Sequence, residues 1–169
     1  IPLTINTDFK INPRFTGIII DAITIKEAPA WLKKRLEKVG LRPINNIVDI
    51  TNYVMLELGN PLHAFDYKKI KGNTLNVVQA NGGEEFKSVD GITYDLPKGA
   101  VVIKDSEKII DLCGIKGGFN SQISNETKTI FIRVPIEIST LIRKASQALG
   151  LRSEASSIFE RGVNSSGTI

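Results

Sequence analysis

Five short segments with β-strand character follow one another between residues 75 and 113, and this block constrains the fold more than any other feature. The dipeptide Asp90-Gly91 separates two of these segments and predicts a two-residue hairpin turn between them. The middle third of the chain is therefore predicted to be β-structure. The strand candidates are residues 75–80, 84–89, 92–96, 100–104 and 109–113.

Two more β-type segments lie outside this block. Residues 17–23 read GIIIDAI, a β-branched run that is typical of a strand buried on at least one face. Residues 129–134 predict another strand. Pro135 follows it, and because proline has no N–H to donate, this strand is not expected to continue far as a central strand.

Helical patterns lie on both sides of the β block. Residues 29–40 begin with a proline and end with a glycine, and residues 45–58 carry an apolar stripe before a Gly-Asn-Pro stop. Residues 139–149 predict a third helix, and a short one begins near Ser153. We therefore expect an α+β fold, with mixed and antiparallel sheets in layers that pack against helices from both ends of the chain.

Composition excludes several kinds of site and setting. Hydrophobic residues make up 41% and charged residues 24%, as in a globular protein, and no apolar run approaches the ~20 residues that span a bilayer. One cysteine and one histidine permit no internal disulfide and cannot supply a zinc site, so a reducing, cytoplasmic setting is expected. The net charge of +4 permits a polyanionic partner without requiring one.

His63, the single histidine, is the first candidate for chemistry. It follows the Gly-Asn-Pro turn, and Asn52 lies eleven residues earlier on the polar side of the predicted helix. The turn permits His63 to fold back towards Asn52, although spacing alone does not establish a contact. A lone histidine beside a turn is more often structural, and no local motif marks a serine or cysteine as its nucleophilic partner.

Two further features allow either a functional or a structural interpretation. The loop at residues 114–118 reads GIKGG, which permits close backbone approach to a ligand but lacks the Walker pattern and is equally consistent with a tight turn. The C-terminal third is basic through Arg143, Lys144 and Arg152, and Glu160-Arg161 is a candidate local ion pair. Such charges usually lie on a solvated face.

Four segments, in this order, resemble the beta subunit of bacterial phenylalanyl-tRNA synthetase. The resemblance implies that residues 1–169 are a single module excised from a larger subunit. By the same resemblance, this module is the editing module, which comprises the third and fourth domains of the subunit. A start at Ile1 rather than Met fits an excised fragment. The segments are RPINNIVDITNYVMLELGNPLHAFD at 42–66, CGIKGG at 113–118, ETKTIFI at 126–132 and GLRSEASSIFERGV at 150–163.

The resemblance implies an α+β module that hydrolyses tyrosine wrongly attached to the phenylalanine tRNA, using an oriented water and no metal. A pocket built for phenylalanine rejects an added hydroxyl by only ~10²-fold, whereas a second site that hydrogen-bonds the hydroxyl discriminates far better. By the same resemblance, Asn52 and His63 are catalytic, holding the terminal adenosine, the ester or the water. Gly117 shapes the pocket, and Ser153 and Ala155 line its amino-acid side.

The resemblance also implies the partners. The module would bind the 3′ end of the phenylalanine tRNA and would join the synthetase alpha subunit through the full beta subunit, with no membrane partner. No cofactor is expected in this fragment, because the ATP and magnesium of the ligase reaction belong to the whole synthetase. The fragment alone would be at most an aminoacyl-tRNA hydrolase within an aminoacyl-tRNA synthetase.

Arg133 departs from the family pattern. It stands where the family usually has a glutamate that reads the tyrosine hydroxyl, and a guanidinium donates hydrogen bonds where a carboxylate accepts them. A second hypothesis follows, namely an editing-deficient module that serves the same synthetase as a structural and tRNA-binding part. If the Arg133 side chain points away from His63, this argument from polarity does not apply.

Overall fold

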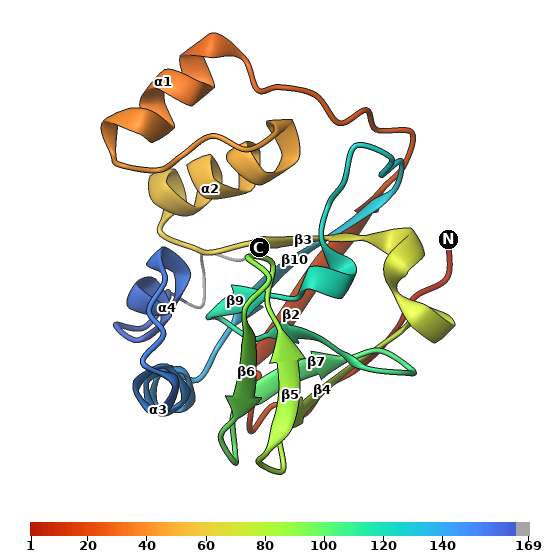
Figure 1. The fold of residues 1–169 in the computed structure, drawn as a ribbon, viewed down its shortest axis with the longest axis vertical. Coiled ribbons are helices and arrows are strands. Elements are labelled where there is room, and N and C mark those ends of the chain that lie inside the picture. The colour runs from red at the N-terminus through yellow and green to blue at the C-terminus, as the bar shows by residue number, and fades with distance from the viewer. Residues whose placement is uncertain (165–169) are drawn as a thin grey trace.

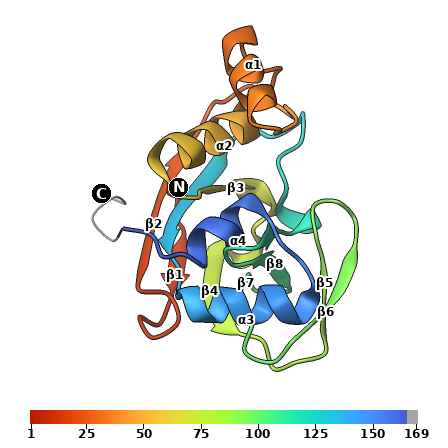
Figure 2. The ribbon, with the colours of Figure 1, turned by 90° about the vertical axis from the view of Figure 1, so that its left-hand side faces the viewer.

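The structure is a computed structural model that describes residues 1–164, so the last five residues of the predicted module 1–169 lie outside the described part. Within that part the fold is α+β, as predicted, and helices lie at both ends of the molecule (Figures 1 and 2). The helices are α1 (Ala30–Lys38), α2 (Asn46–Leu58), α3 (Ser139–Leu149) and α4 (Glu154–Phe159). The strands are β1 (Thr4–Asn6), β2 (Arg14–Ile20), β3 (His63–Asp66), β4 (Thr74–Gln79), β5 (Glu84–Lys87), β6 (Thr93–Leu96), β7 (Val101–Lys104), β8 (Ile109–Leu112), β9 (Lys116–Gly117) and β10 (Ile130–Ile136).

The strands form three sheets, and both mixed and antiparallel pairings occur. A five-stranded sheet has the order β1-β4-β7-β8-β9, in which β1 runs parallel to β4 and the remaining neighbours are antiparallel. A three-stranded antiparallel sheet has the order β2-β10-β3, and β5 pairs with β6 in a separate hairpin.

The five-stranded sheet is buried on both faces. Successive side chains of a strand point to opposite faces, so Val101 and Ile103 of β7 face the three-stranded sheet, while Val102 packs with Ile142 of α3. Burial on both sides explains why β7 reads as an unbroken apolar run instead of an alternating one. Each such side chain contributes ~1.5–3 kcal/mol to folding.

The three-stranded sheet lies between the five-stranded sheet and α2. Phe65 and Phe131 pack into the core shared with the five-stranded sheet, whereas Ala64 and Ile130 pack with Ile47 of α2 on the other face. Helix α1 forms the outermost layer through a small cluster with α2, and α3 lies at the opposite end of the molecule (Figures 1 and 2). None of the helices in residues 1–164 has the length and apolar character needed to cross a membrane.

Two predictions about the β-structure were wrong, and the one about Pro135 was confirmed. The strand predicted at 17–23 is β2, which ends at Ile20, because Ala22 adopts a left-handed conformation with φ 55°. The hairpin loop has three residues instead of two, since the Ser88 N–H donates to the Ile92 carbonyl. Strand β10 is central only up to Arg133, as predicted, and it then continues through Pro135 to Ile136. It can do so because β3 pairs with β10 only as far as Arg133, so Pro135 has one neighbouring strand.

Candidate functional site

A pocket of about 80 Å³ opens where the two larger sheets meet α4. His63 at the start of β3 and Arg133 of β10 are directly opposite in the strand register, so both side chains project to the same side. The five-stranded sheet and α4 complete the walls. The lining residues include His63, Asp111 of β8, Gly117 of β9, Arg133, and Ala155 and Phe159 of α4.

The backbone of Gly117 supports the His63 ring. A Cβ built on Gly117 would lie 2.7 Å from His63 Nε2 and closer still to Cε1, so no larger residue fits while the ring stays in place. The ring also meets Phe65 edge-on, with centroids 4.5 Å apart at 85°. His63 Nε2 is buried and has no hydrogen-bond partner among residues 1–164. The imidazole is therefore held in one orientation with a free nitrogen.

Asp111 is the group nearest to that nitrogen. Its Oδ1 lies 4.0 Å from His63 Nε2, too far for a direct hydrogen bond, and its Oδ2 lies 3.6 Å from Arg133 Nη1. The Asp111 side chain is 5% exposed. This carboxylate thus stands between the histidine and the arginine.

Arg133 is almost fully buried, with 1% of its side chain exposed, and is held by carboxylates and an aromatic ring. Its Nη2 donates to Glu137 Oε1 at 2.5 Å, and its guanidinium lies 4.8 Å from the centre of the Phe15 ring. Glu137 in turn accepts from Asn12 Nδ2 at 3.0 Å. A buried polar chain therefore runs from Asn12 through Glu137, Arg133 and Asp111 to His63.

Burial sets the protonation of the pocket. It lowers the pKa of His63 to about 4, and the nearby Arg133 charge lowers it further in the same direction. Burial raises the pKa of Asp111 to about 7. The Arg133 charge acts in the opposite direction and lowers this pKa, whereas the Glu137 charge raises it. At neutral pH the imidazole is therefore uncharged, while Asp111 can take up or release a proton.

The structure brings four of the six predicted site residues into this pocket, namely His63, Gly117, Arg133 and Ala155. Arg133 faces the same side as His63, so the argument from its polarity applies. Asn52 and Ser153 are not among the residues that line the pocket. Ser153 instead caps α4: its Oγ accepts from the Ser156 N–H at 3.1 Å. Catalytic and substrate-binding roles for all six residues remain predictions.

Sequence reasoning missed Asp111 and Glu137. Each left a local signal: Asp111 interrupts the apolar run of residues 109–113, and Glu137 lies four residues after Arg133, just beyond the predicted strand 129–134. A charged residue inside a predicted buried strand needs a partner, and that requirement singles out Asp111 itself and Glu137 as the partner of Arg133. Within the described part of the chain, no group of three or more His, Cys, Asp or Glu side chains is arranged to hold a metal ion.

The chain is similar in sequence to beta subunits of phenylalanine–tRNA ligases. The chain is 44% identical over 154 residues to the phenylalanine–tRNA ligase beta subunit of Carboxydothermus hydrogenoformans, and 43% identical over 152 residues to that of Thermotoga maritima. These alignments cover 91% and 90% of this chain but only 19% of each relative. The chain thus spans about a fifth of the length of these relatives.

A solved structure shares the fold. It is an N-terminal fragment of the phenylalanyl-tRNA synthetase beta subunit from Pyrococcus horikoshii, with a TM-score of 0.60 at 15% identity, covering 89% of this chain and 50% of the fragment. The protein family described as the B3/4 domain matches residues 11–169, and this range includes every residue of the pocket. The chain therefore belongs to the B3/4 domain family.

Proposed function

We propose that this chain is the tRNA-editing module of a phenylalanine–tRNA ligase beta subunit and that its pocket hydrolyses tyrosine misattached to the phenylalanine tRNA. The observation that carries the proposal is the pair formed by His63 and Asp111, whose Nε2 and Oδ1 atoms face each other at 4.0 Å without a direct hydrogen bond. The similarity to beta subunits over nine-tenths of the chain supports the assignment to a ligase.

The gap between the two side chains suits one water molecule. A water can lie ~2.8 Å from both atoms when they are 4.0 Å apart, which satisfies the unpaired Nε2 and holds the water in a defined place. Such a water is oriented by a rigid ring, because Gly117 and Phe65 fix the imidazole. Orientation of this kind is a large source of rate in hydrolysis.

Asp111 is the better proton acceptor of the two. A general base works best with a pKa near the working pH, and the pKa of Asp111 is raised to about 7, whereas that of His63 is lowered to about 4. In the proposed step the water oxygen attacks the ester carbonyl, and its proton passes to Asp111. The ester C–O bond breaks, the ribose oxygen takes up a proton, and tyrosine leaves.

Arg133 supports selection of tyrosine in a way that differs from the usual glutamate. Its guanidinium lines the pocket, and its buried Nε has no partner among the described residues, so it retains a donor for the phenol oxygen. The charge that would otherwise repel the substrate ammonium group is balanced by Glu137 and Asp111. A phenylalanine side chain would leave such a donor unpaired, which is the basis of rejection.

The wider assignments follow from the same proposal. The complete protein would bind the 3′ end of the phenylalanine tRNA, assemble with the alpha subunit and work in the cytoplasm. The ligase reaction, with its ATP and magnesium, would take place outside these residues.

A second candidate function is an editing-deficient module that serves as a structural and tRNA-binding part of the same synthetase. The observation in its favour is that Arg133, which stands where the resemblance implies a carboxylate, is already bonded to Glu137 at 2.5 Å. On this view the polar chain from Asn12 to His63 stabilises the fold and does not act on substrate.

Single-turnover deacylation of tyrosyl-tRNA by the complete protein separates the two. Active editing predicts hydrolysis that falls ~10²-fold or more in Asp111→Asn and in His63→Ala, with phenylalanyl-tRNA left intact. Wild-type hydrolysis no faster than the spontaneous rate, in a protein that still binds the tRNA, would favour the editing-deficient module.

A further inference from the structure

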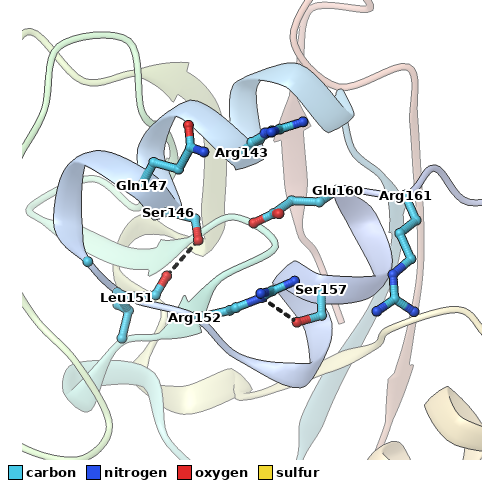
Figure 3. A pocket seen from close by; sticks show the side chains of 9 residues that line it. Arg143, Ser146, Gln147, Leu151, Arg152, Ser157, Glu160 and Arg161 are labelled. Carbon is cyan, nitrogen blue, oxygen red and sulfur yellow. Dashed lines mark hydrogen bonds between the residues drawn. The ribbon is translucent and has the colours of Figure 1, made fainter.

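A second hollow lies on the other side of α4 from the His63 pocket. It has a volume of about 460 Å³ and opens between α3, the connection at residues 150–152, and α4 with the two residues that follow it (Figure 3). Its walls are polar and basic. They are formed by Arg143, Ser146, Gln147, Gly150, Leu151, Arg152, Ser157, Glu160 and Arg161.

Three arginines surround this hollow, and one acidic side chain, Glu160, points into it (Figure 3). Arg143, Arg152 and Arg161 are all exposed, and none has a carboxylate within 4.0 Å among residues 1–164. The local ion pair between Glu160 and Arg161 that the sequence suggested does not form. The hollow thus has a net charge of +2 with its guanidinium groups available.

Part of the site is already ordered. Arg152 Nε donates to Ser157 Oγ at 3.1 Å, which leaves the other nitrogens of this guanidinium free for a ligand. Ser146 Oγ donates to the Leu151 carbonyl at 2.7 Å and ties the connecting segment to α3 (Figure 3). Guanidinium groups bind phosphate through two parallel hydrogen bonds, so an arginine set on a fixed support favours phosphate oxygens.

Helix α4 links this hollow to the His63 pocket. Ala155 and Phe159 line the His63 pocket, whereas Ser157 and the following Glu160 line the basic hollow. The two sites are thus separated by about one helix diameter, ~10 Å, a distance that a few nucleotides of a single strand can span. A nucleic-acid strand that ends in one site would carry its backbone past the other.

We propose that the hollow formed by Arg143, Arg152 and Arg161 binds backbone phosphates of the single-stranded 3′ end of the tRNA whose terminal ester enters the His63 pocket. This inference rests on the proposed function, to which it adds the surface that guides the RNA. Gln147 and Ser157 add neutral hydrogen-bonding groups at the rim. Glu160 limits the affinity, so that the strand can leave after hydrolysis.

The test measures RNA binding by the complete protein, using fluorescence anisotropy of a labelled 12-nucleotide RNA with the acceptor-end sequence. The variant Arg143→Gln/Arg152→Gln/Arg161→Gln should bind at least tenfold more weakly at low salt. The slope of log K against log salt should become shallower by about 2, because each phosphate contact on a single strand contributes ~0.7. Inorganic phosphate at the same ionic strength should compete only weakly, since one phosphate replaces several contacts.

Two matched variants make the result specific. The variant Lys34→Gln/Lys38→Gln/Arg42→Gln also removes three positive charges, but from the exposed α1 end of the molecule. It should leave the slope of log K against log salt unchanged. Glu160→Gln should tighten RNA binding severalfold, an effect that loss of folding cannot produce. The inference is overturned if the arginine variant weakens binding no more than the lysine control does, or if Glu160→Gln has no effect.

The outcome is separable from that of the proposed function. If the arginine variant does not weaken RNA binding but hydrolysis still depends on His63, the proposed phosphate site is refuted and the proposed editing function stands. Charge-dependent RNA binding without any hydrolysis of tyrosyl-tRNA would keep the phosphate site and favour the editing-deficient module.

Discussion

Replacing Arg133 by glutamine should destabilise the protein strongly, because Arg133 is the cation between two buried carboxylates. Glu137 bonds to it at 2.5 Å and Asp111 lies 3.6 Å away, and both carboxylates are at most 5% exposed. Removal of one partner from a buried ion pair costs ~3–5 kcal/mol, since the remaining charge is left without compensation. The contact with the Phe15 ring, worth ~0.5–2 kcal/mol, is lost as well.

The effect can be measured by urea and thermal unfolding. A loss of ~3–5 kcal/mol corresponds to a fall in Tm of ~6–20 °C for a domain of this size, at ~2–4 °C per kcal/mol. The double variant Arg133→Gln/Glu137→Gln should be more stable than Arg133→Gln alone, because it no longer leaves Glu137 charged and unpaired. The penalty of Arg133→Gln should also shrink as the pH falls towards 5, since burial raises the pKa of Asp111 to about 7 and the stranded Asp111 carboxylate then takes up a proton.

Two results would refute this reasoning. A cost below ~1 kcal/mol for Arg133→Gln would mean that the ion pairs contribute no more than exposed ones do. Costs of Arg133→Gln and Glu137→Gln that simply add in the double variant would show that the two side chains are not coupled.

Three further outcomes follow from the pocket. Gly117→Ala should fold normally but lose ~10²-fold in hydrolysis, because its Cβ displaces the His63 ring; unchanged activity in deacylation assays would contradict this. NMR titration of the single imidazole of the 169-residue chain should give a pKa of about 4, rising in Arg133→Gln as the neighbouring cation is removed. In the wild-type protein, the contribution of neutral His63 to the free energy of unfolding is lost as the pH falls from 6.5 to about 4. The contribution of protonated Asp111 to the same free energy is lost as the pH rises through about 7. The two trends oppose each other, so Asp111→Asn should show a steeper loss of stability below pH 6.5 in urea unfolding.

Helices and the middle strands were predictable because their signals are local. Helix α2 begins where Asn45 caps the N–H groups of Ile47 and Val48, and it ends at Gly59 with φ 69°. The strands of the middle block are confirmed for the same reason, since turn residues separate them along the chain. Strand β3 was not predicted: its four residues, HAFD, carry little β propensity and pair only because β10 lies beside them.

The pocket was predictable only in part because it depends on how two sheets approach. His63 and Gly117 were reached through a resemblance, whereas their contact results from β3 and β9 belonging to different sheets. Asp111 faces His63 because it pairs with Ile103, whose side chain lies on the face of β7 turned to the three-stranded sheet. Register of this kind is set by distant residues, so no local pattern around residue 111 reveals its partner.

The buried polar chain changes how the substitution at residue 133 has to be tested. Introducing the glutamate that the resemblance implies, by Arg133→Glu, would place three carboxylates, those of residues 111, 133 and 137, in one buried cluster, and the variant should unfold instead of gaining activity. The charge swap Arg133→Glu/Glu137→Arg keeps the pair and moves a carboxylate to the position beside His63. If the swapped protein folds and hydrolyses tyrosyl-tRNA faster than wild type, then Arg133 limits editing. If it folds but is slower, Arg133 belongs to the working site, and the pocket reads the phenol with a donor.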